Sequence, residues 1–402
     1  MKGIDESRIA VVGGGPAGVM AAEVLSARGA RVTVYDRMPS LGRKFLMAGR
    51  GGLNLTHSEP FEPFLSRYGA AAERLRPYLE AFPPAALVAW AEELGQPTFT
   101  GSSGRIFPKA MKASPLLRAW IARLADQGVR FELRAEWLGF EADGALRFHD
   151  REPVRVDAVV LALGGASWPR LGATGGWAGI LAGEGIEVAP FEPSNVGVNV
   201  PWSDHFRGRF AGAPLKPLAL TFGRKIIRGE AMVTRYGLEG GAIYALSAAL
   251  RDAAARDGQA VLELDLHPNL TAEQLAARLA RPRRGQTAAN FLRKAAGLSP
   301  VAVNLIREAH GGALPDDLAV AIKRLRLTVT GVQGLERAIS SAGGVAWDEV
   351  DEHLMLRKRP GVFVAGEMLD WEAPTGGYLL QACFATGVAA AEGVLARLNP
   401  RG

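Results

Sequence analysis

Residues 8–36 read RIAVVGGGPAGVMAAEVLSARGARVTVYD, and this stretch decides the fold. Its apolar start, residues 9–12, is typical of a buried strand in a parallel sheet. Gly13, Gly15 and Gly18 follow with the spacing G-x-G-x-x-G. The first of these glycines permits a tight turn, the second lets the backbone approach a pyrophosphate, and the third lets a helix pack closely on the strand.

The remainder of the stretch completes a strand–helix–strand unit. A helix is expected from Pro16 to just before Gly29, a residue that suits its carboxyl-terminal cap. The start of this helix would direct N–H groups and the positive end of its dipole toward a phosphate. Residues 32–35 form the second strand, and Asp36 at its end is placed to accept a hydrogen bond from a ribose hydroxyl. The unit predicts dinucleotide binding but does not separate FAD from NAD(P).

Composition limits the classes of protein to consider. The chain has 402 residues, of which 48% are hydrophobic, and a formal net charge of +6. This length exceeds one ordinary hydrophobic core, so two or three domains are expected. The charge is too small to indicate nucleic-acid binding by itself. A single cysteine, Cys383, excludes an internal disulfide and suits a reducing compartment.

Targeting signals are not evident in the sequence. No unbroken apolar segment reaches the roughly 18 residues that a membrane span needs. The chain opens MKGIDESR and enters its first strand directly, so no signal peptide is expected. We therefore expect a soluble, cytoplasmic protein with no membrane partner.

Changes in composition along the chain predict four segments. Residues 1–192 and 331–402 share apolar strands, glycine turns and helices, and are expected to form one α/β domain. Prolines cluster after residue 192, and alternating segments predict a strand-rich insertion over residues 193–270. Residues 271–330 are expected to form a small helical domain.

A second motif, GVFVAGEMLDWEAPTGGYLLQACFATGVAAA, covers residues 361–391. A short strand delivers Gly366 and Glu367 to the carboxyl edge of the sheet, where ligands bind in open α/β folds. Gly376 and Gly377 then open a helix whose amino end would stabilise negative charge on a flavin pyrimidine ring. The alternative is an ordinary glycine-capped helix, but the glycine fingerprint in the same chain favours a flavin.

A third motif is the basic, glycine-rich loop GRKFLMAGRGGLNLTHS over residues 42–58. Its glycines let backbone N–H groups crowd a ligand, while Arg43 and Lys44 supply cationic donors. Asn54 and Thr56 could form hydrogen bonds with flavin edges or substrate. Alone, the loop could equally be a flexible basic segment; beside a dinucleotide unit, we expect it to bind the ligand.

Together these motifs resemble the HI0933-like family of FAD-dependent flavoproteins, and most of all its NAD(P)/FAD-dependent oxidoreductase subgroup. The resemblance rests on GGGPAG, GRKFLMAGRGGLNLTH, ALGGASWPRLGATGG, SSAGGV and GVFVAGEMLDWEAPTGGYLLQ, which run from Gly13 to Gln381. It implies a Rossmann-like, two-dinucleotide-binding-type FAD domain, split by an inserted β-barrel-like domain and a small helical domain. It also implies noncovalent FAD with redox chemistry at the flavin ring.

The resemblance assigns cofactor-binding positions residue by residue. Gly13, Gly15 and Gly18 would hold the pyrophosphate, Asp36 the adenosine ribose, Glu367 the ribityl chain, and the backbone of Trp137 the adenine. The full predicted cofactor-binding set is Gly13, Gly15, Pro16, Ala17, Gly18, Asp36, Arg37, Gly42, Arg43, Lys44, Gly52, Leu53, Asn54, Trp137, Gly164, Gly366, Glu367, Gly376, Gly377, Tyr378 and Leu379.

Two departures from the family pattern matter. The family loop commonly reads G-G-G-R-C-N or G-N-G-R-C-N, whereas this chain has leucine at position 53 and its arginine at position 50. A family role for that cysteine therefore cannot apply here. The usual S-T-G-D-G stretch is ATGGW over residues 173–177, which lacks its acid.

Other candidate residues have plainer explanations. Cys383 lies in an apolar helical segment and is expected to be a buried small hydrophobe rather than a redox thiol. The six histidines show no metal-ligand spacing, so no metal is expected. His57 follows the flavin loop and is the one histidine to consider as a site residue. The basic run over residues 278–294 is expected to be a solvated helical face.

We therefore expect an FAD-dependent oxidoreductase that passes a hydride or electron pair from a reduced donor to an organic acceptor. No second G-x-G-x-x-G unit appears, so NAD(P)H, the expected donor, would dock transiently at the flavin. The expected partner is a small-molecule substrate, and nucleic acid is not the favoured one. Two alternatives remain: a tRNA-modifying flavoprotein, and a flavin-binding sensor without turnover. The sequence identifies neither a catalytic proton donor nor the oligomeric state.

Overall fold

A computed structural model gives the fold of the chain and describes residues 4–283 and 285–399. The chain divides into two compact units. The first consists of Met1–Glu192 and Ser340–Gly402, and the second is Pro193–Ile339. Each unit has its own cluster of buried apolar side chains.

The first unit is built on a five-stranded parallel sheet with the order β19-β9-β1-β2-β6. Its strands are β1 (Arg8–Val12), β2 (Arg31–Asp36), β6 (Arg130–Leu133), β9 (Ala158–Leu161) and β19 (Val362–Val364). β1 lies at the centre because its run of apolar side chains can be buried on both faces of the sheet. This arrangement confirms the Rossmann-like α/β fold predicted from the opening motif.

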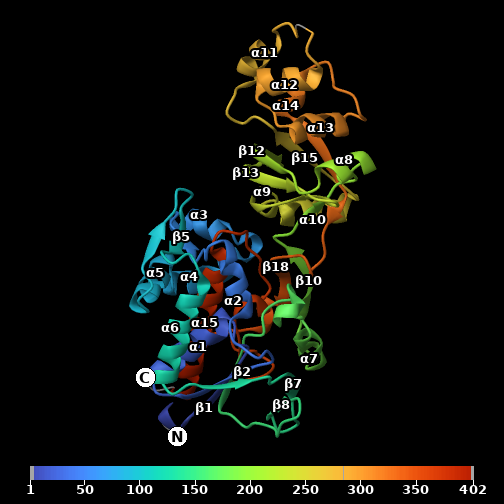
Figure 1. Ribbon diagram of the computed structural model, residues 1–402. Coiled ribbons are helices and arrows are strands. Elements are labelled where there is room, and N and C mark those ends of the chain that lie inside the picture. Colours follow the sequence, from blue (N-terminus) through green and yellow to red (C-terminus); the bar gives the residue numbers. More distant parts are fainter. Residues whose placement is uncertain (1–3, 284, 400–402) are drawn as a thin grey trace. The chain divides into compact units, whose positions relative to one another are not determined.

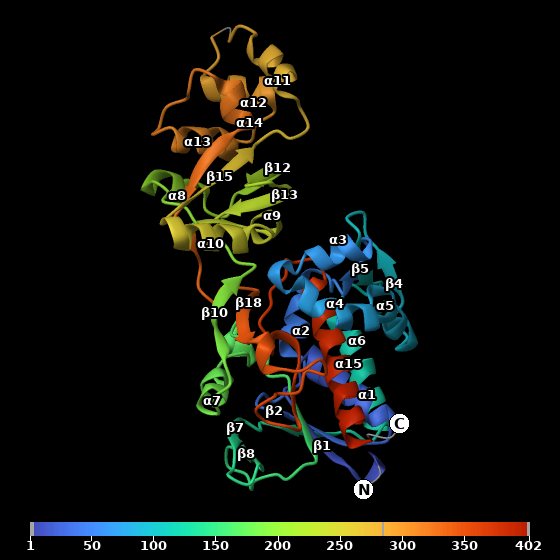
Figure 2. The same ribbon diagram turned by 180° about the vertical axis from the view of Figure 1, so that it is seen from behind.

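Two helices, one from each end of the chain, pack side by side in this unit: α1 (Pro16–Ala27) and α15 (Tyr378–Leu398) (Figures 1 and 2). A Cβ atom added at Gly387 would lie 2.4 Å from the carbonyl oxygen of Ala17. Glycine is therefore what lets α15 approach the first turn of α1. By length and composition α15 could cross a membrane, but 61% of its apolar window is buried inside the protein, as in a core helix.

The rest of the first unit surrounds this core. Its other helices are α2 (Arg43–Ala48), α3 (Phe61–Ser66), α4 (Ala72–Ala81), α5 (Pro84–Glu93), α6 (Ala113–Asp126) and α7 (Trp177–Gly183). Its small sheets pair β3 (Thr56–His57), β5 (Arg105–Pro108) and β4 (Thr98–Thr100), then β7 (Trp137–Phe140) with β8 (Leu146–Phe148), and β10 (Val188–Ser194) with β18 (Ser340–Val345).

One local prediction was wrong. Residues 42–58 were expected to form a basic loop, but α2 lies inside this segment. Gly42 adopts a left-handed conformation with φ of 63° and turns the chain, and the six residues after it contain no proline or β-branched side chain. Those residues therefore form a short helix without strain.

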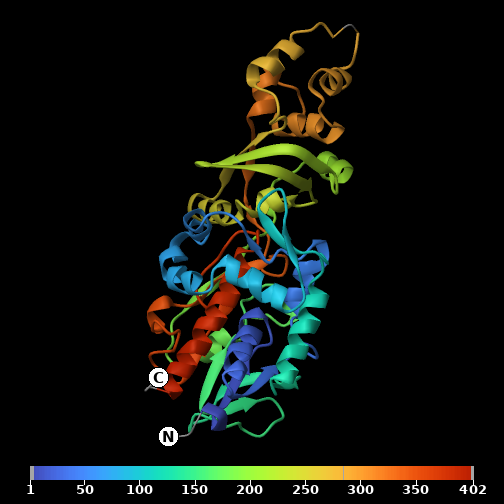
Figure 3. The same cartoon turned by 90° about the vertical axis from the view of Figure 1, so that its left-hand side faces the viewer.

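The second unit contains a seven-stranded antiparallel sheet with the order β16-β15-β12-β13-β14-β11-β17. Its strands are β11 (Val198–Asn199), β12 (Pro214–Phe222), β13 (Lys225–Val233), β14 (Gly237–Glu239), β15 (Ala260–Asp265), β16 (Leu325–Val329) and β17 (Gly331–Val332). The pair β12–β13 forms the long yellow-green hairpin of Figure 3. β16 and β17 stand at the two ends of this strand order, yet only Thr330 separates them in the sequence.

The helices of the second unit are mostly short. They are α8 (Asp204–Phe210), α9 (Gly241–Tyr244), α10 (Ser247–Asp257), α11 (Ala272–Leu279), α12 (Ala288–Ala296), α13 (Pro300–Ala309) and α14 (Leu318–Lys323). Side-chain caps from Thr271, Thr287 and Ser299 begin α11, α12 and α13.

Candidate functional site

The glycine turn after β1 forms a cradle that larger residues would fill. Gly13 has φ of 110°, and a Cβ atom added there would lie 2.1 Å from the carbonyl oxygen of Ala162. A Cβ atom at Gly18 would lie 2.0 Å from the carbonyl oxygen of Gly13. At Gly15, by contrast, a Cβ atom would meet nothing within 4 Å. The turn is thus closed on its protein side and open at Gly15, where a ligand can approach.

The start of α1 presents backbone donors to this opening. Gly15 is the N-cap and supplies no side-chain cap, and the backbone N–H of Val19 makes the first bond, to the carbonyl oxygen of Gly15 at 2.9 Å. The N–H groups of Ala17 and Gly18 precede this bond and have no partner within the helix. Together with the helix dipole they suit an anionic group such as a diphosphate.

Asp36 at the end of β2 is tied to the same turn. Its carboxylate accepts hydrogen bonds from the backbone N–H of Gly14 at 2.8 Å and of Met38 at 2.7 Å. Burial raises the pKa of Asp36, although both of these bonds lower it. Each carboxylate oxygen keeps a second lone pair, so an incoming hydroxyl could still donate to it. Arg37, next in the chain, donates to the hydroxyl of Thr174 at 3.0 Å.

Lys44 and Glu367 form an ion pair between segments that are far apart in the sequence. The ammonium of Lys44 lies 2.8 Å from Oε2 of Glu367 and donates to the hydroxyl of Ser167 at 2.9 Å. The other carboxylate oxygen, Oε1, is buried and finds no hydrogen-bond partner in the described part of the chain. A buried oxygen without a donor is costly, so it marks a position where a ligand hydroxyl would fit.

These features line one cleft of about 740 Å³, a volume that includes space open to solvent. The structure brings together there the predicted residues Gly13, Gly15, Pro16, Ala17, Asp36, Arg37, Gly42, Arg43, Lys44, Gly164, Gly366 and Glu367. It adds residues not predicted: Gly14, Met38, Ser40, Phe45, Ala162, Leu163, Leu171, Gly172, Ala173, Ala365 and Cys383.

Five of the added residues adjoin predicted positions, and four more lie in the motif ALGGASWPRLGATGG over residues 162–176: Gly14, Met38, Phe45, Leu163 and Ala365, then Ala162, Leu171, Gly172 and Ala173. Cys383 is different: it lies one helical turn beyond Leu379, so helical spacing was the available signal. Burial raises the pKa of the Cys383 thiol, and the nearby Glu367 raises it further. The thiol is therefore neutral and poorly reactive at neutral pH.

A second group of predicted residues gathers where β3 meets the start of α15. A Cβ atom added at Gly377 would lie 2.5 Å from the Cα of Thr56, so the two backbones touch. The side-chain oxygens of Asn54 and Thr56 are buried and lack hydrogen-bond partners among the residues described. Gly52, Leu53, Asn54, Gly376, Gly377, Tyr378 and Leu379 belong to this group and do not line the cleft above.

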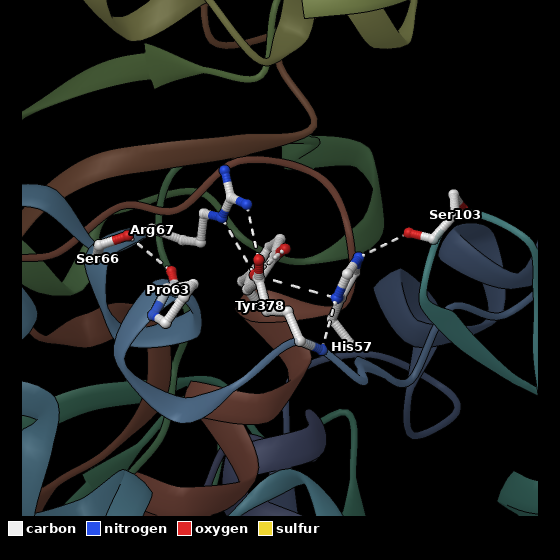
Figure 4. A network of polar contacts seen from close by, with 7 residues as sticks. His57, Pro63, Ser66, Arg67, Ser103 and Tyr378 are labelled. Carbon is white, nitrogen blue, oxygen red and sulfur yellow. Dashed lines mark hydrogen bonds and ion pairs between the residues drawn. The ribbon is translucent and has the colours of Figure 1, made fainter.

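The Tyr378 side chain is held in a polar network (Figure 4). Its hydroxyl donates to Glu59 at 2.5 Å, and Arg67 donates to both oxygens of the same carboxylate. Burial raises the pKa of Glu59, but the hydrogen bonds from Arg67 and Tyr378 outweigh it and leave the pKa below its ordinary value. The side chain of Tyr378 is thus engaged, so the predicted contact with flavin would come from its backbone.

His57 belongs to the same network and is satisfied by protein groups. Its Nδ1 accepts from the backbone N–H of Glu59 at 3.1 Å, and its Nε2 lies 2.9 Å from the carbonyl oxygen of Ser103. Because Nδ1 accepts a hydrogen bond, Nε2 is the ring nitrogen that can donate to this carbonyl oxygen. Its ring stacks on Tyr378 with centroids 5.6 Å apart. His57 therefore acts here as a structural residue that links two segments.

Two predicted residues lie outside both groups. Gly18 packs behind the turn rather than facing the cleft. Trp137 is buried in β7 against Phe140, with ring centroids 5.2 Å apart, and does not line the cleft. Its proposed backbone contact with adenine stays a prediction.

The chemistry of these groups fits FAD. Free N–H groups at a helix start suit the diphosphate, and the unpartnered oxygen of Glu367 suits a polyhydroxyl chain. The crowded backbone at Gly377 places the start of a second helix beside the loop that contains Asn54. Fold and site together define the class: a Rossmann-type protein whose cleft suits FAD.

Comparison with known proteins identifies the family. The profile of the HI0933-like protein Rossmann domain matches residues 7–393, so the chain belongs to the HI0933-like family. This confirms the resemblance drawn from the motifs.

Relatives and solved structures agree with this assignment. The chain is 28% identical over 404 residues to a 3-dehydro-bile acid delta(4,6)-reductase of Clostridium scindens, covering 95% of this chain and 97% of that protein. It is 25% identical over 414 residues to a ribosomal RNA dihydrouridine synthase of Escherichia coli, covering 96% and 97%. A 3-ketosteroid delta1-dehydrogenase structure from Sterolibacterium denitrificans shares the fold, with a TM-score of 0.52 at 13% identity over 97% of this chain and 99% of that one.

Proposed function

We propose that the protein is an FAD-dependent reductase that saturates a carbon–carbon double bond conjugated with a carbonyl group, with NAD(P)H as the reductant. A hydride equivalent adds to the β-carbon and a solvent-derived proton to the α-carbon. The double bond becomes a single bond, and NAD(P)H is oxidised to NAD(P)⁺. Bound FAD supplies the two-electron carrier between donor and acceptor.

The names of the relatives support this reaction class. A 3-dehydro-bile acid delta(4,6)-reductase reduces double bonds in a keto steroid, and a dihydrouridine synthase reduces the double bond of uracil. Both bonds are conjugated with a carbonyl, although the two substrates differ in every other respect. Because each relative aligns over at least 95% of this chain, the shared bond change is the part of their chemistry that we carry over.

The observation that carries the proposal in this structure is the cleft built around Lys44 and Glu367. The start of α1 would hold the FAD diphosphate, and Oε1 of Glu367 would accept from the ribityl chain while the hydrogen bond from Lys44 holds Oε2. The N–H groups of Tyr378 and Leu379 precede the first bond of α15, which Gln381 makes to Gly377 at 3.0 Å. They would stabilise negative charge on the adjacent flavin edge.

The experiment is a two-step anaerobic reduction of the purified holoprotein. NADPH and NADH are each mixed with it in a stopped-flow instrument, and the reduced protein is then mixed with an enone or with an isolated alkene. We expect bleaching of the flavin band by at least one nucleotide and reoxidation by the enone alone. Absence of bleaching with both nucleotides, or equal reoxidation by the alkene, contradicts the proposal; the sensor alternative predicts no rapid bleaching.

Glu367→Gln tests the cofactor part of the proposal. Because the substitution removes the ion pair with Lys44, we expect FAD affinity to fall by about tenfold, from the loss of one charge-assisted hydrogen bond. Glu392→Gln is the matched control. Glu392 lies on α15 and pairs with Arg28 on the surface, where its side chain is 49% exposed. Equal affinity in the two variants contradicts the assigned role of Glu367.

A second candidate is reduction of uracil in RNA, and one observation favours it. Residues 271–330 contain ten Lys or Arg and four Asp or Glu, a net charge of +6 that equals the charge of the whole chain. Arg278, Arg281, Arg293 and Lys294 are exposed, and within the described ranges none forms an ion pair. Binding of an RNA oligonucleotide that weakens steeply with salt would support this candidate. Indifference to RNA at low salt would remove it.

A further inference from the structure

Two exposed apolar side chains, Phe99 and Met111, and the partly buried Phe107 form a surface in the first unit, here called the apolar wall. Phe99 on β4 and Phe107 on β5 stack with ring centroids 5.8 Å apart and planes inclined by 27°. Phe99 is 39% exposed and Met111 is 38% exposed. Exposed apolar side chains that gather in one part of a surface are typical of a binding site.

The apolar wall touches the loop that is predicted to line the flavin. A Cβ atom added at Gly52 would lie 2.7 Å from Cε of Met111 and 3.6 Å from the ring of Phe107. The backbone N–H of Leu53 donates to the carbonyl oxygen of Met111 at 2.9 Å. A group resting on the wall would therefore lie against the same loop as the flavin.

Backbone strain marks the same place. Met111 has φ of 58°, a left-handed conformation that non-glycine residues rarely adopt. Such conformations persist where the surrounding structure enforces them, and they concentrate at binding sites. Here the hydrogen bond from Leu53 holds the strained residue and keeps its side chain at the wall.

The hairpin that carries the two phenylalanines is fixed at its tip as well. The backbone N–H of Ser58 donates to the carbonyl oxygen of Gly104 at 2.8 Å, and the ring of His57 contacts the carbonyl oxygen of Ser103 (Figure 4). His57 in turn stacks on Tyr378 at the start of α15. The wall is thus a preformed surface, which lowers the entropic cost of binding a rigid ligand.

We propose that the apolar wall binds the electron acceptor, and that this acceptor is a ring-fused, largely apolar α,β-unsaturated ketone. The inference rests on the proposed function, because it places the conjugated double bond at the flavin loop. Stacked aromatic rings and a methionine offer broad contact to a flat hydrocarbon framework. A uracil base could also stack there, so an RNA substrate is the competing outcome of the test.

The test measures binding rather than turnover. Purified holoprotein is titrated with 4-androstene-3,17-dione as the probe, and separately with a uridine oligonucleotide, while the shift of the flavin absorption band is recorded. Phe99→Ala and Met111→Ala remove parts of the wall at half-exposed positions. Leu138→Ala is the matched control, because Leu138 is 37% exposed in the same unit but lies on β7, outside the wall.

We expect the steroid probe to shift the flavin band, with its Kd raised about tenfold in each wall variant and unchanged in the control. Each of the three variants should purify with the flavin content and the circular dichroism spectrum of the native protein, which shows that it folds and holds FAD. Unchanged Kd values in the wall variants overturn the inference, as does a response to the oligonucleotide with none to the steroid. If enones reoxidise the protein while the wall variants bind the steroid normally, the role assigned to the wall is wrong and the proposed function stands.

Discussion

Glu23 is a buried carboxylate that supports the first unit from inside α1. It accepts hydrogen bonds from the indole N–H groups of Trp90 at 3.0 Å and of Trp120, and from Arg123 at 2.8 Å. Glu23 is only 7% exposed, so water cannot easily replace its carboxylate as the acceptor for these three donors. We expect Glu23→Gln to destabilise the protein by about 3 kcal/mol, because its amide group would face the guanidinium of Arg123. Urea unfolding followed by tryptophan fluorescence measures this.

Glu93→Gln is the control for Glu23. Glu93 also lies near Arg123, at 4.0 Å, but its side chain is 71% exposed, so its ion pair should contribute little. Similar losses of stability in the two variants would show that burial of Glu23 is not the cause.

The lowered pKa of Glu59 predicts that part of the protein's stability depends on pH. Its pKa in the folded protein lies below its ordinary value of 4.5, since the bonds from Arg67 and Tyr378 outweigh burial. A carboxyl group of this kind stabilises the fold fully above 4.5 and loses that contribution as the pH falls through the folded-state pKa. We expect Glu59→Gln to cost about 2 kcal/mol at pH 7, and the difference from the native protein to shrink below about pH 4.5.

Urea unfolding of both proteins in steps from pH 7 to about pH 3.5 checks this linkage. Glu62→Gln serves as a control, because Glu62 pairs with Arg76 on the surface and its side chain is 69% exposed. A gap between native protein and Glu59→Gln that stays constant down to the lowest pH contradicts the assignment.

Individual residues were predictable where a local pattern dictates them. The spacing of Gly13, Gly15 and Gly18 followed from the needs of a tight turn before a helix, and the structure shows why no larger residue fits at the first and third. The ion pair of Lys44 with Glu367 could not be predicted, because 323 residues separate its partners and only the folded sheet brings them together. The network of Glu59 and Tyr378 was missed for the same reason.

At the scale of elements, the contact between α1 and α15 connects helix packing to the cofactor site. Gly387 allows the closest approach, since its absent Cβ would lie 2.4 Å from the backbone of Ala17. We expect Gly387→Ala to push the first turn of α1 away, weakening FAD binding about tenfold and lowering the free energy of unfolding by about 2 kcal/mol. FAD titration by fluorescence and thermal unfolding measure both effects.

Gly179→Ala provides the control for this packing argument. Gly179 lies in α7, and a Cβ atom there would meet nothing within 4 Å. Replacing glycine by alanine in an open helical position should stabilise the protein slightly, by up to about 1 kcal/mol. If both glycine variants behave alike, close packing at Gly387 is not what sets the position of α1.

Elements with strong periodic or apolar patterns were predicted well, and short ones were not. β1 and β19 are largely apolar runs next to glycine, and the structure places both in the parallel sheet as expected. The short helix α2 was missed because it has six residues, too few to show a helical repeat. Its start depends on the left-handed conformation of Gly42, which the sequence permits but does not require.

At the scale of the whole molecule, each unit has its own hydrophobic core, and the residues assigned to the cofactor lie in the first unit. Every residue that lines the cleft belongs to the first unit, and so does the apolar wall. The second unit carries the basic segment over residues 271–330. If FAD binding depends on the first unit alone, the insertion is free to vary between relatives that act on a steroid and on RNA.

The points where the chain leaves and re-enters the first unit are close together, which makes this independence testable. The backbone N–H of Ile339 donates to the carbonyl oxygen of Asn195 at 3.2 Å, and β10 and β18 are neighbours in one sheet. A short turn should therefore replace residues 193–339, because two-residue loops such as Asn-Gly join adjacent antiparallel strands. We expect the shortened protein to bind FAD with an affinity within about tenfold of the full chain, since no cleft residue is removed. Absorbance of the purified protein and FAD titration measure this. A second version replaces the same residues with a longer Gly-Ser linker. If circular dichroism shows that both versions are folded, yet both stay colourless after incubation with FAD, the second unit contributes to the cofactor site.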